Sequence, residues 1–145
     1  MNDTISYKQS AGGIVHHNGK FLALEVLDYG EVVFPKGTIE PGETPEQTAV
    51  REILEETGYQ VTITAPLGEI TYDFTEHDQH YRKMVHYFLL KLIDAKAAPK
   101  PNRQAGENFE NLWLTAEEAF TRLTHEDSKK MLRYALEKLA VSKDS

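Results

Sequence analysis

The most constraining feature of the sequence is the segment Pro45–Thr57, whose ends and apolar spacing both specify an amphipathic helix. Thr44 suits the N-cap, Pro45 suits the first helical position, and Gln47 completes a Thr-x-x-Gln capping box. Gly58 is a natural C-terminal stop. At about 100° per residue the apolar side chains fall on one arc, which we expect to pack against a sheet: Ala49, Val50, Ile53 and Leu54.

The opposite arc of this helix is acidic. Glu52 lies four residues before Glu56 and three before Glu55, so the three carboxylates can converge on one spot. Like charges at these spacings cost a few tenths of a kcal/mol per pair, and a cation would offset that cost. Carboxylate oxygens favour magnesium or manganese over softer metals. Taken alone, three glutamates on a helix are more often a solvated surface.

A fixed frame of residues surrounds these glutamates. The frame is Gly37, five residues, Glu43, seven residues, Arg51-Glu52-Ile53, one residue, Glu55-Glu56, one residue and Gly58-Tyr59. Without the hydrophobic positions Ile53 and Tyr59, seven specified residues remain, and at fixed spacing they arise by chance with a probability on the order of 10⁻⁶ in a chain of this size. The frame therefore favours a functional site over a solvated face.

The segment GTIEPGETPEQTAVREILEETGY, residues 37–59, resembles the Nudix box at every specified position, with Tyr59 where the family more often has an aliphatic residue. The resemblance extends to most of the chain. It implies an α/β fold, the α/β/α sandwich with a mixed central sheet. We expect residues 1–145 to form a single Nudix hydrolase domain.

The resemblance also implies roles for the residues of the box. Arg51 would orient the glutamates through an ion pair, and Glu43 would brace Arg51 or the loop. Mg²⁺ is the implied cofactor, with Mn²⁺ as the alternative, because a divalent cation neutralises phosphates and lowers the pKa of a bound water. A carboxylate then takes the proton of that water, a role that Glu55 could fill. The implied metal ligands are Glu52, Glu55, Glu56 and the carbonyl of Gly37.

A further carboxylate is expected beyond the box. Glu107 lies six residues before Trp113 in ENFENLWLTAEEA, which resembles the segment that supplies an additional metal ligand or general base in several Nudix enzymes. The alternative is a solvent-facing glutamate in a loop, and Glu110 is the nearby competitor.

The substrate class is indicated by a second resemblance. Residues 83–89, KMVHYFL, resemble a strand of the Nudix enzymes that hydrolyse diadenosine polyphosphates, in which the lysine approaches phosphate and the tyrosine stacks on a base. Lys83 and Tyr87 would fill these roles, and Lys36 in FPKG resembles the same group. The alternatives are a strand-end charge for Lys83 and a core aromatic for Tyr87. That group also holds adenine with a second tyrosine, for which the candidates are Phe74, Tyr72, Tyr81 and Phe109.

These resemblances imply hydrolysis of a phosphoanhydride bond by attack of water on phosphorus, most specifically of diadenosine tetraphosphate (Ap4A) to ATP and AMP. Two enzyme alternatives of the same family are a house-cleaning nucleoside triphosphate pyrophosphatase and an RNA 5′-pyrophosphohydrolase. A non-enzyme alternative is a nucleotide-binding Nudix module that has lost catalysis. Loss of a box glutamate would be its expected trace, and none is lost.

The rest of the chain is expected to alternate strands with polar loops and two more helices. Residues 73–83 are polar and are expected to form a mobile loop, and residues 94–106, with two prolines, are expected to form a second loop. Helices are expected after Thr115 and over residues 127–140. Strands are expected over residues 9–27, split by a hairpin turn at Asn18-Gly19, and over 32–34, 60–65, 67–72, 84–93 and 111–114.

Composition narrows the partners. The formal net charge of −7 disfavours a general nucleic-acid binder, leaving an RNA 5′ end as the exception, and favours a small-molecule nucleotide. There is no cysteine, no apolar run of membrane-spanning length and no signal-peptide core. The histidines do not match a metal-protease motif, and there is no GxSxG elbow and no P-loop. We therefore expect a cytoplasmic, soluble protein, monomeric or homodimeric, that does not bind membranes.

Overall fold

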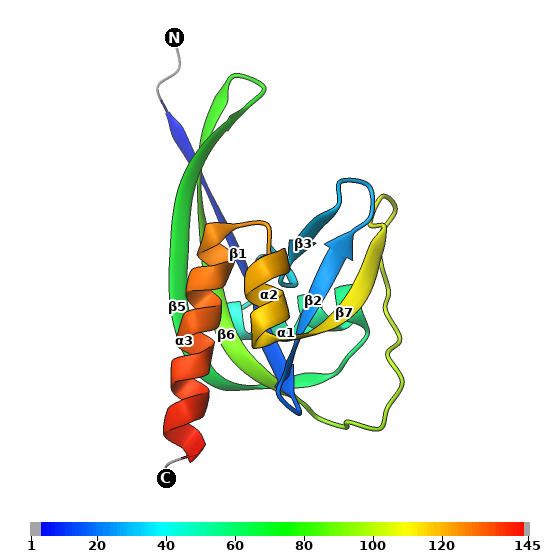
Figure 1. Ribbon diagram of the computed structural model, residues 1–145. Coiled ribbons are helices and arrows are strands. Elements are labelled where there is room, and N and C mark those ends of the chain that lie inside the picture. The colour runs from blue at the N-terminus through cyan, green and yellow to red at the C-terminus, as the bar shows by residue number, and fades with distance from the viewer. Residues whose placement is uncertain (1–3, 144–145) are drawn as a thin grey trace.

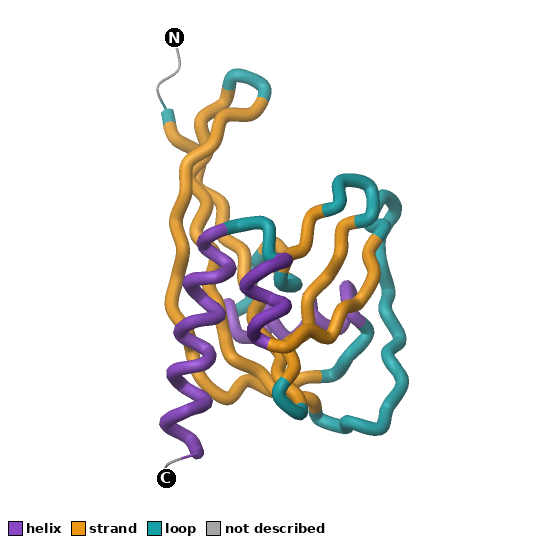
Figure 2. Tube along the Cα trace, viewed as in Figure 1, coloured by secondary structure: helices purple, strands orange, loops and turns teal. Residues whose placement is uncertain are grey.

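The computed structural model describes residues 4–143, and helices cover both faces of its sheet (Figures 1 and 2). Within this part of the chain, no helix is long and apolar enough to cross a membrane. The elements in chain order are β1 (Ile5–His17), β2 (Lys20–Val26), β3 (Glu31–Val33), β4 (Lys36–Thr38), α1 (Pro45–Thr57), β5 (Val61–Glu76), β6 (Gln79–Leu92), β7 (Phe109–Thr115), α2 (Ala116–Arg122) and α3 (Glu126–Lys143).

The sheet is mixed. Its strands follow the order β3-β2-β1-β6-β5, while β4 pairs with β1 and β7 pairs with β2. β1 and β6 run parallel at its centre, and the other pairs are antiparallel. Both central strands are buried on two faces over residues 10–15 of β1 and 87–90 of β6, so these segments read as apolar runs rather than as alternating patterns.

Two separate hydrophobic cores lie on the two faces of this sheet. Because side chains alternate along a strand, Ile14 packs into the core under α2 and α3, and Val15 packs into the core under α1. Leu89 and Leu90 on β6 divide in the same way. The predicted α/β/α sandwich with a mixed sheet is therefore confirmed.

Helix α1 begins and ends where the sequence predicts. The Oγ1 of Thr44 accepts a hydrogen bond from the backbone N–H of Gln47 at 3.1 Å, and the side chain of Gln47 accepts one from the N–H of Thr44 at 3.0 Å. Gly58 closes the helix in the left-handed region with φ of 85°. One expectation was wrong: Leu54 is 37% exposed. Leu54 lies about 100° from Ile53 around the helix, at the margin of the buried arc.

The expected loop over residues 73–83 is instead a hairpin arm, which projects from the body beside the start of β1 (Figure 2). Only His77 and Asp78 form its turn, both with positive φ. Backbone pairing holds the arm, and the guanidinium of Arg82 donates to both carboxylate oxygens of Asp73 at 2.8 and 2.9 Å. Strands exposed on both faces carry polar residues, which is why the sequence resembled a loop.

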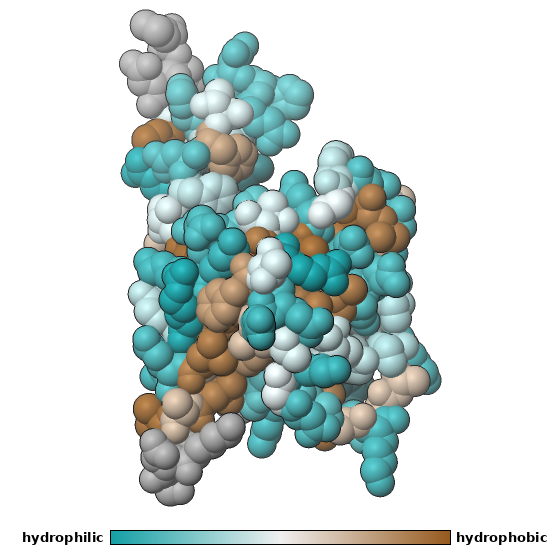
Figure 3. Space-filling model, in the orientation of Figure 1, coloured by the Kyte–Doolittle hydropathy of each residue, from teal (hydrophilic) through white to brown (hydrophobic). Residues whose placement is uncertain are grey.

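Other boundaries differ in smaller ways. β1 begins at Ile5 rather than at residue 9, because it pairs with the arm from His80 onward. The strands predicted at 60–65 and 67–72 are one strand, β5, with irregularities near Pro66 that keep the pairing with β6. β4 is a short strand that the sequence did not predict. The face in Figure 3 is mostly hydrophilic, with hydrophobic atoms gathered along α3 toward its C-terminal end.

Replacing Gly58 with alanine should destabilise the protein by more than the strain of its backbone conformation alone. A Cβ at Gly58 would collide with the backbone nitrogens of Lys100 and Pro101. Gly106→Ala is the matched control, since Gly106 has φ of 89° but open space around it. We expect the control to cost about 1–2 kcal/mol and Gly58→Ala to cost distinctly more in denaturant unfolding. Equal losses would contradict the close contact.

Candidate active site

The guanidinium of Arg51 is the centre of the acidic cluster. Its Nε donates to Glu43 Oε2 at 2.6 Å and its Nη2 to Glu43 Oε1 at 2.8 Å, a paired contact. Its Nη1 donates to Glu52 Oε1 at 2.8 Å and lies 3.3 Å from Glu55 Oε2. Nη2 also reaches the carbonyl of Thr38 at 3.1 Å. Arg51 therefore joins three carboxylates of the box to β4.

Glu43 braces both partners that the sequence left open. Besides Arg51, its Oε1 accepts from the backbone N–H of Glu40 at 3.0 Å and from Thr48 Oγ1 at 2.8 Å. The hydrogen bonds from Arg51, then from Glu40, lower the pKa of Glu43 to about 2. The carboxylate is therefore ionised at neutral pH and ties the loop to the first turns of α1.

Glu56 differs from the other box glutamates because it is buried, with 6% of its surface exposed. Burial, then the charges of Glu52 and Glu107, raises its pKa to about 9. Its Oε1 has no hydrogen-bond partner within residues 4–143, although the backbone N–H of Lys36 donates to the carboxylate. A buried carboxylate oxygen without a partner is costly, so this position favours a bound cation.

Gly37 lies against Glu52. A Cβ at this position would collide with the Glu52 carboxylate, so only glycine lets β4 approach the helix this closely. The pairing of Gly37 with Ala11 on β1 fixes its place in the sheet. The structure therefore brings Gly37 and Glu52 together, as the box implies.

Glu107 also belongs to the cluster. Its charge acts on both Glu52 and Glu56, and it raises the pKa of each carboxyl group. Its Oε1 accepts from the backbone N–H of Gln104 at 2.7 Å. The competitor, Glu110, is exposed on β7, where it pairs in register with Glu25 on β2.

The oxygen atoms of the box glutamates are of the kind that bind a divalent cation, although the described structure does not bring them to one point. Within residues 4–143 no three acidic or histidine side chains form a ready metal cage. Glu52 and Glu55 share the Nη1 of Arg51, while Glu56 lies near Lys36. The oxygen-only set and the unpartnered Glu56 Oε1 suit Mg²⁺ or Mn²⁺. Convergence of the three box glutamates stays a prediction.

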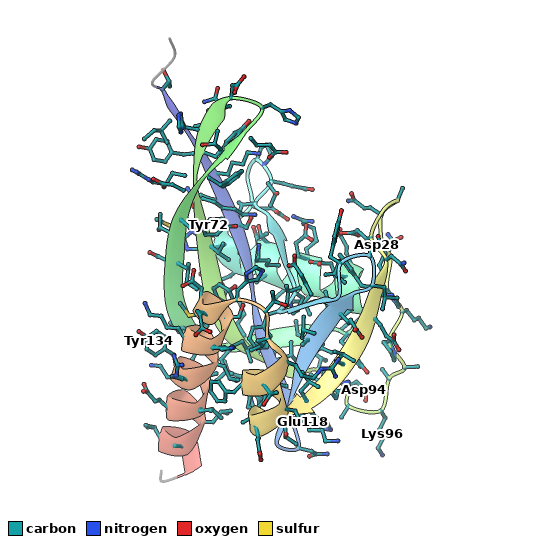
Figure 4. The ribbon with its side chains drawn as sticks, turned by 45° about the horizontal axis from the view of Figure 1, so that its top comes forward. Asp28, Tyr72, Asp94, Lys96, Glu118 and Tyr134 are labelled. Atoms are coloured by element: carbon teal, nitrogen blue, oxygen red, sulfur yellow. The ribbon has the colours of Figure 1, made fainter. Side chains whose placement is uncertain are left out.

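A cavity of about 390 Å³ opens beside this cluster. Lys36 and Glu56 line it together with Tyr87 on β6 and Tyr72 on β5. Tyr72 is 39% exposed and lies near the start of α3 (Figure 4), whereas Tyr87 is 5% exposed and its hydroxyl hydrogen-bonds to Ser128. Tyr87 thus belongs both to the core and to the cavity wall.

The cavity also has a polar side that the sequence did not indicate. It comes from the junction of α2 and α3, where Asp127 and Ser128 face β5 and β6, and from His125 with its partner Glu31 at 3.2 Å. The side chain of Asp127 makes no hydrogen bond or ion pair within the described residues, although its charge acts on Tyr72 and Tyr87. These residues have no fixed spacing from the box, so no motif could have found them.

Phe74 lies outside the cavity, further along the arm. It stacks on Tyr81, with ring centroids 5.1 Å apart and planes 20° apart, and the Nζ of Lys8 lies 4.3 Å from the centre of the Tyr81 ring. Because alternate residues share a face, Phe74 lies on the same side of β5 as Tyr72. Of the predicted substrate-binding aromatics, Tyr87 lines the cavity and Phe74 does not.

The two lysines predicted to bind substrate, Lys36 and Lys83, lie side by side at the base of the arm. The side chains of Lys36 and Lys83 interact directly, and burial, then the charge of Lys83, lowers the pKa of Lys36 to about 8. In the sheet Lys83 lies opposite both Lys8 and Tyr72. Two clustered cations beside the glutamates form a place where a polyanion would relieve their repulsion.

Comparison with known proteins identifies the family. The family model described as NUDIX domain matches residues 7–135. The chain is 36% identical over 101 residues to the MutT4 protein of Mycobacterium tuberculosis, and 31% identical over 105 residues to an 8-oxo-(d)GTP phosphatase of Mycolicibacterium smegmatis. These alignments cover 70% and 72% of the chain but only 39% and 30% of the two relatives.

Among solved structures, the chain resembles an Ap4A hydrolase of C. elegans in a binary complex. The TM-score is 0.69 with 25% sequence identity, over 92% of this chain and 98% of that one. The architecture described above is therefore that of a known fold.

The burial of Glu56 predicts a pH dependence of metal-free stability. A glutamate in an unfolded chain titrates near 4.5, and folding raises the pKa of Glu56 to about 9. Between these values only the folded state holds the proton, so its contribution is present below 4.5 and is lost as the pH rises toward 9. With a chelator present, Glu56→Gln should show a flatter decline of melting temperature between pH 5 and 9 than wild type. Glu46→Gln, on the exposed first turn, is the control and should keep the wild-type slope. Parallel curves for wild type and Glu56→Gln would contradict the buried proton.

Proposed function

Because the chain belongs to the NUDIX family, we propose that it hydrolyses a phosphoanhydride bond in a nucleotide-derived substrate by attack of water on phosphorus. The observation that carries this proposal is the position of Glu56. Its unpartnered carboxylate oxygen lies where the glutamate cluster meets the cavity, next to Lys36. A metal-bound polyphosphate would satisfy both groups.

Mg²⁺ is the proposed cofactor, with Mn²⁺ as the alternative, held by Glu52, Glu55, Glu56 and the Gly37 carbonyl. When bound it would lower the pKa of a water and neutralise phosphate charge. Arg51 keeps two of these carboxylates in place through its Nη1, and Glu43 holds the other side of the guanidinium. The arginine is thus a positioning group, and it is not among the residues that line the cavity.

The proton of the attacking water needs a carboxylate acceptor. Glu107 and Glu55 are the two candidates, since Glu107 lies within electrostatic reach of Glu52 and Glu56, whereas Glu55 is held near Arg51. Glu107 is the better placed, because it has no cationic partner to hold its charge within the described residues. We propose Glu107 as the base.

The proposed substrate is a dinucleoside tetraphosphate, cleaved to a nucleoside triphosphate and a nucleoside monophosphate, as Ap4A is to ATP and AMP. Such a substrate has two bases separated by four phosphates. The cavity wall of Tyr72 and Tyr87 offers a place for one base, and the stacked pair of Phe74 and Tyr81, both half-buried on the arm, offers an aromatic surface for the other. Lys83 lies between these two places.

A second candidate is a house-cleaning nucleoside triphosphate pyrophosphatase, which would share a class of substrate with the M. smegmatis relative named as an 8-oxo-(d)GTP phosphatase. The observation that favours it is Asp127, an unpartnered carboxylate at the cavity. A carboxylate can accept two parallel N–H groups, and guanine offers such a pair on one edge. This candidate needs only the cavity and not the arm.

The experiment that tests the proposal is a substrate panel with Mg²⁺ in ¹⁸O-labelled water. Dinucleoside polyphosphates, ATP, GTP, 8-oxo-dGTP, nucleotide sugars and 5′-triphosphate RNA are each incubated with the protein, and the labelled products are identified by mass spectrometry. Phosphoanhydride cleavage with one ¹⁸O in a product supports the reaction class. If no compound of the panel is cleaved, the proposed reaction is overturned.

Phe74→Ala separates the two substrate candidates. If Phe74 stacks on the second base, the variant should lose about 1–3 kcal/mol of transition-state binding for Ap4A and almost none for ATP or GTP. Tyr29→Ala is the control, because Tyr29 is an aromatic residue 80% exposed in the turn before β3. Equal kcat/KM values for Phe74→Ala and wild type with Ap4A would show that the arm does not bind substrate, and would favour the nucleoside triphosphate pyrophosphatase.

A further inference from the structure

The long loop between β6 and β7 is fastened to the last turn of α1. The backbone N–H of Lys100 donates to the carbonyl of Gly58 at 3.0 Å, and that of Asn102 donates to the carbonyl of Glu55 at 2.8 Å. Carbonyls at a helix C-terminus have no partner within the helix, so these contacts satisfy groups that would otherwise need water. The loop is therefore held to the same turn that carries Glu55 and Glu56.

The side chain of Arg103 connects the loop to α1 and to β7 through three hydrogen bonds. Its Nε donates to the carbonyl of Glu56 at 2.8 Å, its Nη1 to the carbonyl of Phe109 at 2.8 Å, and its Nη2 to Asn111 Oδ1 at 3.1 Å. Asn111 in turn donates to the carbonyl of Thr57 at 2.9 Å. One half-buried guanidinium thus joins the end of the glutamate helix to the start of β7.

Glu107 lies on the short stretch between these two anchors. Arg103 precedes it by four residues, and Phe109, which Arg103 also holds, follows it by two. The backbone N–H of Glu107 donates to the carbonyl of Gln104 at 3.0 Å, and its carboxylate accepts from the Gln104 N–H, so the turn is closed on itself. The place of Glu107 beside Glu52 and Glu56 therefore depends on how this turn is attached to α1.

We propose that Arg103 is a positioning residue, which fixes the Glu107 carboxylate against the metal-binding face of α1. This inference rests on the proposed function, because it takes Glu107 to act in the site. An arginine is required, since three acceptors on two elements need the planar fork of a guanidinium. A lysine ammonium at the same position is a point charge on a flexible stem and cannot hold this geometry.

A purely structural role for Arg103 predicts a different result. It would stabilise the fold, and its loss would lower activity by the same factor whether or not Glu107 is present. A positioning residue acts through Glu107, so its loss should matter little once the carboxylate is gone. A double-mutant cycle measures this difference directly.

The test uses the full chain with the variants Arg103→Lys, Glu107→Gln and the double variant. Mn²⁺ affinity is measured by calorimetry, and kcat/KM with Mg²⁺ is measured on the best substrate of the panel. Arg103→Lys alone should weaken Mn²⁺ binding or kcat/KM by about 10- to 100-fold. In the Glu107→Gln background the same change should have an effect within about twofold. Arg133→Ala is the control, since Arg133 lies on α3 beside Phe120 and should match wild type.

Equal losses from Arg103→Lys in both backgrounds would overturn the proposal, as would wild-type values for Arg103→Lys itself. If Arg103→Lys does not fold, Asn111→Ala takes its place in the cycle, because it removes one acceptor of the same guanidinium and leaves the charge. The Mn²⁺ measurement does not need a substrate. A chain that cleaves no nucleotide but shows the coupling in Mn²⁺ binding would therefore contradict the proposed function and keep this inference.

Discussion

The acidic cluster depends on one cation of the chain, the guanidinium of Arg51. Carboxylates three and four residues apart on a helix repel one another, and Arg51 offsets that repulsion by bonding to Glu43, Glu52 and Glu55 at once. One glutamate of the box is not among these contacts. Glu56 lies outside the contacts of Arg51, buried and with a free oxygen, so the described part of the chain leaves that carboxylate to another cation or to a proton.

The pairing of the strands determines how closely the glutamate helix α1 lies against the sheet. β1 pairs with β4 on one side and with β6 on the other. The same stretch of β1 therefore lies beside Gly37, which contacts Glu52, and beside Tyr87, which lines the cavity. The absence of a side chain at Gly37 is what makes the contact close. On the other side of α1, the loop from β6 to β7 carries Glu107 to the end of the helix. Two sequence-distant segments thus complete a site that the box begins.

The local parts of this arrangement could be predicted from the sequence, because they depend on neighbours. Thr44, Gln47 and Gly58 specify the ends of α1, and the contacts of Arg51 lie within the box. The arm could not be predicted, because its polar strands are held by backbone pairing of β6 with β5 and with β1. Backbone pairing leaves no apolar pattern in the sequence. Asp127 and Ser128 were missed for another reason. They reach the cavity because α3 packs across β5 and β6, and helix packing carries no motif.

The proposed chemistry depends most on Glu56 acting as a ligand of a divalent cation. The most direct measurement is a titration of Mn²⁺ into wild type and Glu56→Gln, followed by electron paramagnetic resonance, with Mg²⁺ added as competitor. Glutamine keeps the size of the side chain and removes its charge. We expect wild type to bind Mn²⁺ in a form that Mg²⁺ displaces, and Glu56→Gln to bind it at least about tenfold more weakly while remaining folded. Equal Mn²⁺ affinity in the two proteins would contradict the account.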